Sequence, residues 1–234
     1  MPIIRAGGAL LYFAHIPKCG GTALGAYLAE RFGPPAFLER KFSARPEAAR
    51  WTRSSPQHVA GEDLARLFPP GFFDAAFAVV RHPLDWLVSA CLFKLEVEDA
   101  VPPGTSFGTW LEGAWEARAR DPFAFDNHIR PTADFLPAPV PADHPAPVPG
   151  DPEPAIFRIE DGLEAVIPWL DAQSGDTTGP REIGRAQWRG HWRIRKGRAA
   201  PDFRADPAER ALVARLYAVD FARFGYDPDG ATRY

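Results

Sequence analysis

The feature of this chain that most constrains its fold is an arrangement that occurs three times: a short apolar run, a polar turn and a helical pattern. The apolar runs cover residues 9–15, Ala75–Val80 and residues 155–159. Runs of this length, rich in β-forming residues, favour buried strands over helices. Strands that alternate with helices predict an α/β fold in which helices cover both faces of a central parallel sheet.

The pattern after each run indicates where a helix lies. Residues 22–32 carry apolar side chains at helical spacing, and Thr22 suits the first turn of a helix. Pro83 suits the first turn of a second helix, which we expect to extend through Leu95. The third apolar run is followed by a helical pattern over residues 162–170.

A last helix has clear boundary signals. Asp206 is a suitable N-cap, Pro207 takes the first helical position, and Glu209 stands three residues after the cap. Apolar residues at helical spacing continue to Phe224, and Gly225 follows. These signals predict one helix over residues 207–224.

Composition places the chain among ordinary globular proteins, and we expect a single domain over residues 1–234. A net charge of −3 argues against binding nucleic acid through a broad basic surface. Cys19 and Cys91 form neither a disulfide framework nor a zinc pattern, so we expect no metal and a reducing compartment. The apolar stretch Ala9–Ala14 is too short for a signal peptide or for the roughly 20 residues of a membrane span. We therefore expect a cytoplasmic protein with no integral membrane segment.

A proline-rich segment follows the middle of the chain. Residues 137–154 contain eight prolines, so they can hold neither a helix nor a central strand. A polyproline docking site for a partner is one interpretation. We favour a solvent-exposed connection.

The most informative stretch is His-Ile-Pro-Lys-Cys-Gly-Gly-Thr at residues 15–22, between a predicted strand and a predicted helix. A turn there presents backbone N–H groups and the positive end of the helix dipole, and glycines allow an anion to approach closely. The motif differs from GxxxxGK[ST] because its lysine precedes the glycines. We expect a phosphate-binding loop with these residues: Lys18, Cys19, Gly20, Gly21, Thr22 and Ala23.

Two further sets of residues suit anions. Arg81 follows the second predicted strand, and Ser89 lies eight residues further on, so both can face the carboxyl edge of the sheet, where open α/β sheets bind ligands. An arginine fork and a hydroxyl suit a second phosphate. The basic run at residues 189–198, with Arg195 and Lys196, is the most concentrated positive charge of the chain. A solvated basic loop is the alternative there.

Together the two units resemble the sulfotransferases that use 3′-phosphoadenosine 5′-phosphosulfate (PAPS). HIPKCGGT resembles the 5′-phosphosulfate loop of that family, and VVRHPLDWLVSA resembles its 3′-phosphate motif. The resemblance is greatest to the carbohydrate-type branch, with the heparan and chondroitin uronosyl 2-O-sulfotransferases and many bacterial relatives. It implies a P-loop-like α/β domain, PAPS as the sulfuryl donor without a metal, and a hydroxyl acceptor that belongs to a carbohydrate or glycoconjugate.

The resemblance also implies roles for single residues. Lys18 would stabilise charge on the leaving phosphate, Arg195 and Lys196 would contact PAPS, and Cys19 would be a small loop residue. His58 lies between the two motifs, in the position of the histidine base of uronosyl 2-O-sulfotransferases, and is our preferred general base. Three other residues stay open as the base: His128, Glu62 and Asp63.

Two other functions stay open at this point. A nucleotide-dependent kinase would use the same kind of sheet, but GxxxxGK[ST] is missing from the sequence. An inactive nucleotide- or anion-binding module would keep both phosphate sites and lack a base. We expect acceptor specificity to lie in cleft-lining loops, at residues 96–126 and in the proline-rich segment.

Overall fold

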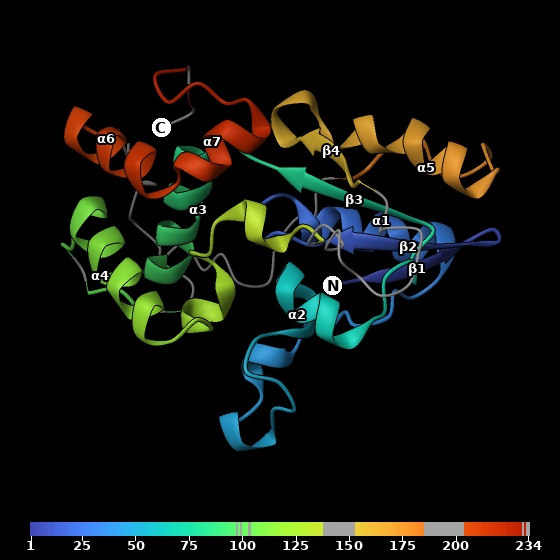
Figure 1. Ribbon diagram of the computed structural model, residues 1–234, viewed down its shortest axis with the longest axis horizontal. Coiled ribbons are helices and arrows are strands. Elements are labelled where there is room, and N and C mark those ends of the chain that lie inside the picture. Colours follow the sequence, from blue (N-terminus) through green and yellow to red (C-terminus); the bar gives the residue numbers. More distant parts are fainter. Residues whose placement is uncertain are drawn as a thin grey trace. The chain divides into compact units, whose positions relative to one another are not determined.

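A computed structural model describes residues 1–96, 98, 100–102, 104–137, 153–184, 204–230 and 232. The chain forms two compact units (Figure 1). The first unit combines Met1–Val80 with Asp134–Ala186, and the second combines Arg81–Ala133 with Gln187–Tyr234. The single domain expected over residues 1–234 stays a prediction. Most of the proline-rich segment, at 138–152, and the basic run lie outside the described residues.

The first unit contains a four-stranded sheet in the order β1-β2-β3-β4. The strands are β1 (Ile3–Ala6), β2 (Ala9–Ala14), β3 (Ala75–Val80) and β4 (Ala155–Arg158). β2, β3 and β4 are parallel neighbours, as predicted, whereas β1 pairs antiparallel with β2 through a turn at Gly7 and Gly8. The α/β fold with a mostly parallel sheet is confirmed, and β1 is an antiparallel edge strand that the sequence patterns did not predict.

Aromatic side chains pack on both faces of this sheet. Successive residues of a strand point to opposite faces, so Tyr12 packs on Phe73 with ring centroids 5.2 Å apart, while Phe13 stacks on Phe77 at 4.8 Å. Phe77 also meets Trp169, at 5.0 Å. Every residue of β3 is buried, as expected for a central parallel strand.

The described part of the first unit contains three α-helices: α1 (Gly21–Phe32), α2 (Gly61–Leu67) and α5 (Val166–Ser174). The helix predicted over 162–170 begins later than expected, at Val166, after the short turn Leu163–Ala165. Pro168 accounts for the shift, because proline is tolerated only in the first turn of a helix, where its missing N–H needs no partner. Short 3₁₀ turns lie at Phe42–Ala44, Glu47–Ala49, Pro56–His58 and Ile159–Asp161.

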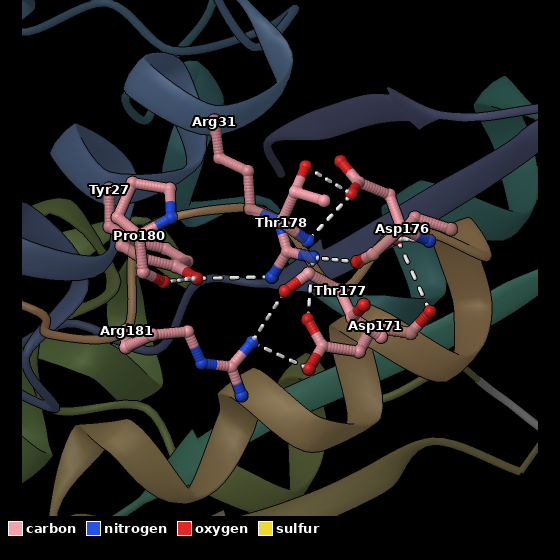
Figure 2. A network of polar contacts seen from close by, with 9 residues as sticks. Tyr27, Arg31, Asp171, Asp176, Thr177, Thr178, Pro180 and Arg181 are labelled. Atoms are coloured by element: carbon pink, nitrogen blue, oxygen red, sulfur yellow. Dashed lines mark hydrogen bonds and ion pairs between the residues drawn. The ribbon is translucent and has the colours of Figure 1, made fainter.

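A polar network joins α1 to α5 (Figure 2). Arg31 of α1 reaches Asp171 of α5 at 2.6 Å and donates to the Tyr27 hydroxyl at 3.0 Å, while Arg181 reaches the same carboxylate at 2.7 Å. Burial opposes the charge on Arg31, but the bonds to Asp171 and Tyr27 raise the pKa of this guanidinium. Arg181 first and then Arg31 lower the pKa of Asp171. The network therefore holds the end of α1 and the segment after α5 together.

The second unit is helical where it is described, with α3 (Pro83–Glu96), α4 (Phe107–Arg120), α6 (Pro207–Leu216) and α7 (Ala218–Phe224). Tyr217 lies at its centre, fully buried between Trp86 at 5.5 Å and Trp115 at 5.2 Å between ring centroids. Its hydroxyl donates to the backbone oxygen of Ile129 at 2.7 Å. A further 3₁₀ turn of this unit lies at Ala124–Asn127, and another, at Thr132–Phe135, lies where the chain passes from the second unit to the first.

Two predictions need correction in this unit. The capping box at Asp206 and Glu209 is confirmed, but the predicted final helix breaks at Tyr217, whose φ of −115° and ψ of 27° are not helical. The break accompanies the central packing of that side chain. Residues 96–126, expected to be loop, contain α4, which Ser106 caps by accepting a bond from the Thr109 N–H.

Candidate functional site

The loop between β2 and α1 has the backbone that the motif predicts. Lys18 and Gly20 have positive φ, 63° and 78°, and Gly20 is the residue that precedes α1. A Cβ on Gly20 would lie 2.9 Å from Leu163 and 3.3 Å from Ile159, so a side chain has little room there. The N-cap residue of α1 is this glycine, so the helix has no N-cap side chain to bond its first turn. Its first turn therefore presents the N–H groups and positive dipole end that suit an anion.

Gly21, the first residue of α1, packs against the imidazole of His15. A Cβ built on Gly21 would lie 1.7 Å from Nε2 of His15, much closer than any real contact. The ring of His15 occupies the space that a side chain at residue 21 would need. The glycine is therefore required by packing as well as by the approach of an anion.

The remaining loop side chains differ in exposure. Lys18 is half-buried and Thr22 is exposed, while Ala23 is buried. Cys19 is only 1% exposed, so its thiol packs inside the unit. Of the six predicted residues, the first three lie in the loop and the last three begin α1, and Lys18 is partly accessible.

His58 lies beside this loop. Its Nδ1 is 3.1 Å from the backbone oxygen of His15, and the two imidazole rings are 4.9 Å apart between centroids. A carbonyl oxygen only accepts hydrogen bonds, so Nδ1 of His58 carries the proton. In the neutral ring Nε2 then holds the lone pair. The histidine predicted as the base therefore lies beside the predicted phosphate-binding loop, and its neutral ring has the tautomer that can accept a proton at Nε2.

His15 itself was not singled out by sequence reasoning. It is 8% exposed, it stacks on Phe13 with 5.2 Å between ring centroids, and its Nδ1 has no hydrogen-bond partner among the described residues. Burial, followed by the nearby charge of His58, lowers the pKa of His15 well below its ordinary value. This imidazole is therefore neutral at physiological pH. Its place at the start of the octapeptide was the available signal.

Arg81 and Ser89 belong to the second unit. Arg81 directly follows the last residue of β3 and is half-buried, and Ser89, also half-buried, lies on α3. His82 between them is anchored: its Nδ1 accepts from the Leu84 N–H at 3.3 Å, and its Nε2 donates to the Asp227 oxygen at 3.1 Å. Lys18 and His58 belong to the first unit. The residues predicted to bind the 3′-phosphate and those predicted for the 5′ end are therefore each described within their own unit. Arg195 and Lys196 lie outside the described residues.

The competing bases have different surroundings. His128 is buried in the second unit, stacks on Phe93 at 5.7 Å, and donates from Nδ1 to the backbone oxygen of Phe125 at 2.8 Å. Three consecutive residues with positive φ, 125–127, precede it. Glu62 and Asp63 lie in the first turn of α2, where Asp63 pairs with Arg66 at 3.1 Å. His58 is bonded to the motif at residues 15–22, through the backbone oxygen of His15.

Comparison with known proteins decides the family. The family model described as "Sulfotransferase family" matches residues 2–227, nearly the whole chain. The chain belongs to the sulfotransferase family. No curated protein and no solved structure matches it.

This membership makes the chain an enzyme that transfers a sulfuryl group, and it implies a hydroxyl acceptor. The α/β fold with its open, mostly parallel sheet agrees with the family. Within the described residues, no group of three or more His, Cys, Asp and Glu side chains is placed to hold a metal ion. A search of those same residues finds no helix long and apolar enough to span a membrane.

Proposed function

We propose that this sulfotransferase moves the sulfuryl group of PAPS to a hydroxyl of a carbohydrate or glycoconjugate. One observation supports this most: the uncapped start of α1, with Lys18 in its loop, lies beside a histidine whose tautomer is fixed by the same loop. The features expected of an anion site and of a base therefore occur together. The carbohydrate acceptor rests on the resemblance of the two motifs to the uronosyl 2-O-sulfotransferases.

The loop fits the 5′ end of the donor. Backbone N–H groups at the start of α1 favour negative charge, and Gly20 and Gly21 let it approach the backbone. Lys18 supplies a positive charge that stabilises the phosphate as the sulfuryl group leaves. Arg81 and Ser89 would hold the 3′-phosphate, and Arg195 and Lys196 would add contacts to PAPS.

His58 would act on the acceptor. Its Nε2 takes the proton of the acceptor hydroxyl, the oxygen forms a bond to sulfur, and the bond from sulfur to the 5′-phosphate oxygen breaks. The products are a sulfate ester, adenosine 3′,5′-bisphosphate and a protonated His58. In-line transfer of this kind depends on positioning and charge stabilisation, by analogy with phosphoryl transfer.

Nucleotide binding tests the two phosphate sites. Adenosine 3′,5′-bisphosphate should protect the protein from thermal unfolding more than adenosine 5′-monophosphate does at the same concentration. Arg81→Ala and Ser89→Ala should reduce that difference, because they remove contacts to the 3′-phosphate alone. Equal protection by both nucleotides would contradict the 3′ site.

Variants of the histidines test the base. His58→Ala should bind adenosine 3′,5′-bisphosphate like wild type and transfer roughly 10² to 10⁴ times more slowly, whereas His128→Ala should have a milder effect. An active His58→Ala with an unchanged pH profile, beside an inactive His128→Ala or Glu62→Gln, would move the base to that residue. A mass-spectrometric screen of sulfated products identifies the acceptor.

The cytoplasmic location stays a prediction. The observation that agrees with it is that Cys19 and Cys91 are both buried thiols. Burial, with a smaller effect of Glu209, raises the pKa of Cys91 to about 12, so this thiol is unreactive at neutral pH.

A further inference from the structure

The imidazole of His15 lies at the start of α1 and has a polar edge that the described contacts leave unexplained. The ring is more than nine-tenths buried, and Nε2 is its atom nearest to the Cβ position of Gly21. In a helix each Cα–Cβ bond tilts toward the N-terminus. A group at the Cβ position of the first helical residue therefore lies beside the helix end that presents its N–H groups.

The surroundings of His15 decide which nitrogen carries the proton. Nδ1 is buried and has no hydrogen-bond partner among the described residues. A buried N–H without an acceptor is costly, and such groups are rare in proteins. The proton therefore lies on Nε2, and Nδ1 holds the lone pair. The ring is neutral, with its one N–H on the edge that faces Gly21.

We infer that Nε2 of His15 donates a hydrogen bond to the phosphosulfate end of the donor at the start of α1. This inference rests on the proposed function, since it adds a ligand-contacting side chain to the same anion site. Two independent observations support the inference. The helix start has no N-cap side chain, and the Nε2 edge of a buried histidine is directed at that start. His15 would thus complement Lys18 with a neutral donor.

The roles of the two histidines differ, although their rings are 4.9 Å apart. His58 carries its proton on Nδ1, which donates to the backbone oxygen of His15, so that bond survives any change of the His15 side chain. Variants of His15 therefore test its imidazole without removing the contact that fixes His58.

Binding of adenosine 3′,5′-bisphosphate, measured by calorimetry, tests the inference. His15→Phe keeps a ring of similar shape and loses the donor, so its dissociation constant should rise roughly 10- to 100-fold, the range for a hydrogen bond to a charged group. His15→Gln places an amide N–H near the position of Nε2 and should bind within a few fold of wild type. His15→Asn places its amide near Nδ1 and should bind like His15→Phe.

The possible results separate this inference from the proposed function. Wild type that does not bind the bisphosphate would contradict the proposed function. If wild type binds the bisphosphate and His15→Phe binds it like wild type, the anion site stands and the role of His15 is wrong. Thermal unfolding without ligand shows which variants fold.

A second measurement does not depend on any variant's affinity. In protein labelled with ¹⁵N-histidine, two-bond ¹H–¹⁵N spectra show which ring nitrogen is protonated, and His15→Gln identifies the signals of His15 among the six histidines. We expect His15 to be neutral with its proton on Nε2. A proton on Nδ1 would overturn the inference.

Discussion

Replacement of Gly21 by alanine tests the packing on which the candidate site depends. The new Cβ would lie 1.7 Å from Nε2 and 2.1 Å from Cδ2 of His15. Real Cβ atoms essentially never come within 3.0 Å of another group, so the ring or the helix start must move by more than an ångström. The ring has little freedom, because it is buried and stacked on Phe13.

The size of the effect follows from two opposing contributions. Overpacking a well-packed site costs about 1 to 3 kcal/mol, and a displacement this large belongs at the upper end. Alanine recovers up to about 1 kcal/mol of helix propensity. We therefore expect Gly21→Ala to lower the free energy of unfolding by about 2 kcal/mol, as measured by urea denaturation.

Gly25 provides a matched control in the same helix. A Cβ there would meet only Leu38, at 3.5 Å, which is an ordinary van der Waals contact. Gly25→Ala should therefore be neutral or stabilising, by up to about 1 kcal/mol. The two variants make the same chemical change in α1 and differ only in what the new methyl group meets.

A double-mutant cycle connects the effect to His15. In a His15→Ala background the space is open, so Gly21→Ala should cost little, and the coupling free energy should be about 2 kcal/mol. Additive effects, or a Gly21→Ala protein as stable as Gly25→Ala, would refute the reasoning that the imidazole fills the Gly21 position.

Three further predictions follow from buried or paired charges. The pKa of His15 is lowered in the folded protein, so below about pH 6.5 the unfolded chain binds a proton that the native state does not. As the pH falls through this range, the free energy of unfolding should therefore decrease by up to about 1.4 kcal/mol per pH unit. His15→Gln should flatten this slope in urea titrations from pH 7 to 5, and equal slopes would count against a neutral buried ring. Asp220→Ala should cost about 3 kcal/mol or more in urea unfolding, because the fully buried carboxylate accepts the N–H groups of Thr132 and Ala133, each at 2.8 Å; a loss below 1 kcal/mol would exclude this role. Asp171→Asn should lower the melting temperature at neutral pH, and its effect should vanish as acid protonates the carboxylate of wild type, whose pKa is lowered; a pH-independent effect would contradict the ion pairing.

Sequence patterns predicted the strands and helices that carry clear signals within their own residues, such as apolar runs and cap residues. β2 and β3 carry continuous apolar runs, and β3 is buried along its whole length, as a central parallel strand must be. The apolar run of β4 also predicted a strand, but β4 is the edge strand of the sheet, and its residues are half-buried or exposed. β1 lacks such a run, and only the Gly-Gly pair after it indicated a hairpin. The pairing with β2 that stabilises it is a property of the sheet.

The helical errors have a similar origin. α4 contains two glycines, which weaken the helical pattern, although Ser106 was an available cap signal. The break at Tyr217 could not be predicted, because Trp86 and Ile129, which contact this side chain, are distant in the sequence.

The candidate site was predictable to a similar extent. Anion binding by the loop is predicted from its residue types and from its place between a strand and a helix, and the structure confirms that place. The proximity of His58 to that loop needed a resemblance to a family, since 43 residues separate it from His15. The packing of His15 on Gly21 depends on where β2 ends relative to α1, which no local pattern specifies.

Transfer of labelled sulfate tests the central claim most directly. Wild-type protein would be incubated with ³⁵S-labelled PAPS and a mixture of oligosaccharides, with Lys18→Ala as the matched variant and γ-labelled ATP as the competing donor. We predict that label moves from PAPS to an oligosaccharide, that ATP gives no labelled product, and that Lys18→Ala transfers about 10² times more slowly or worse. Transfer from ATP and not from PAPS, or a Lys18→Ala protein as fast as wild type, would contradict the account.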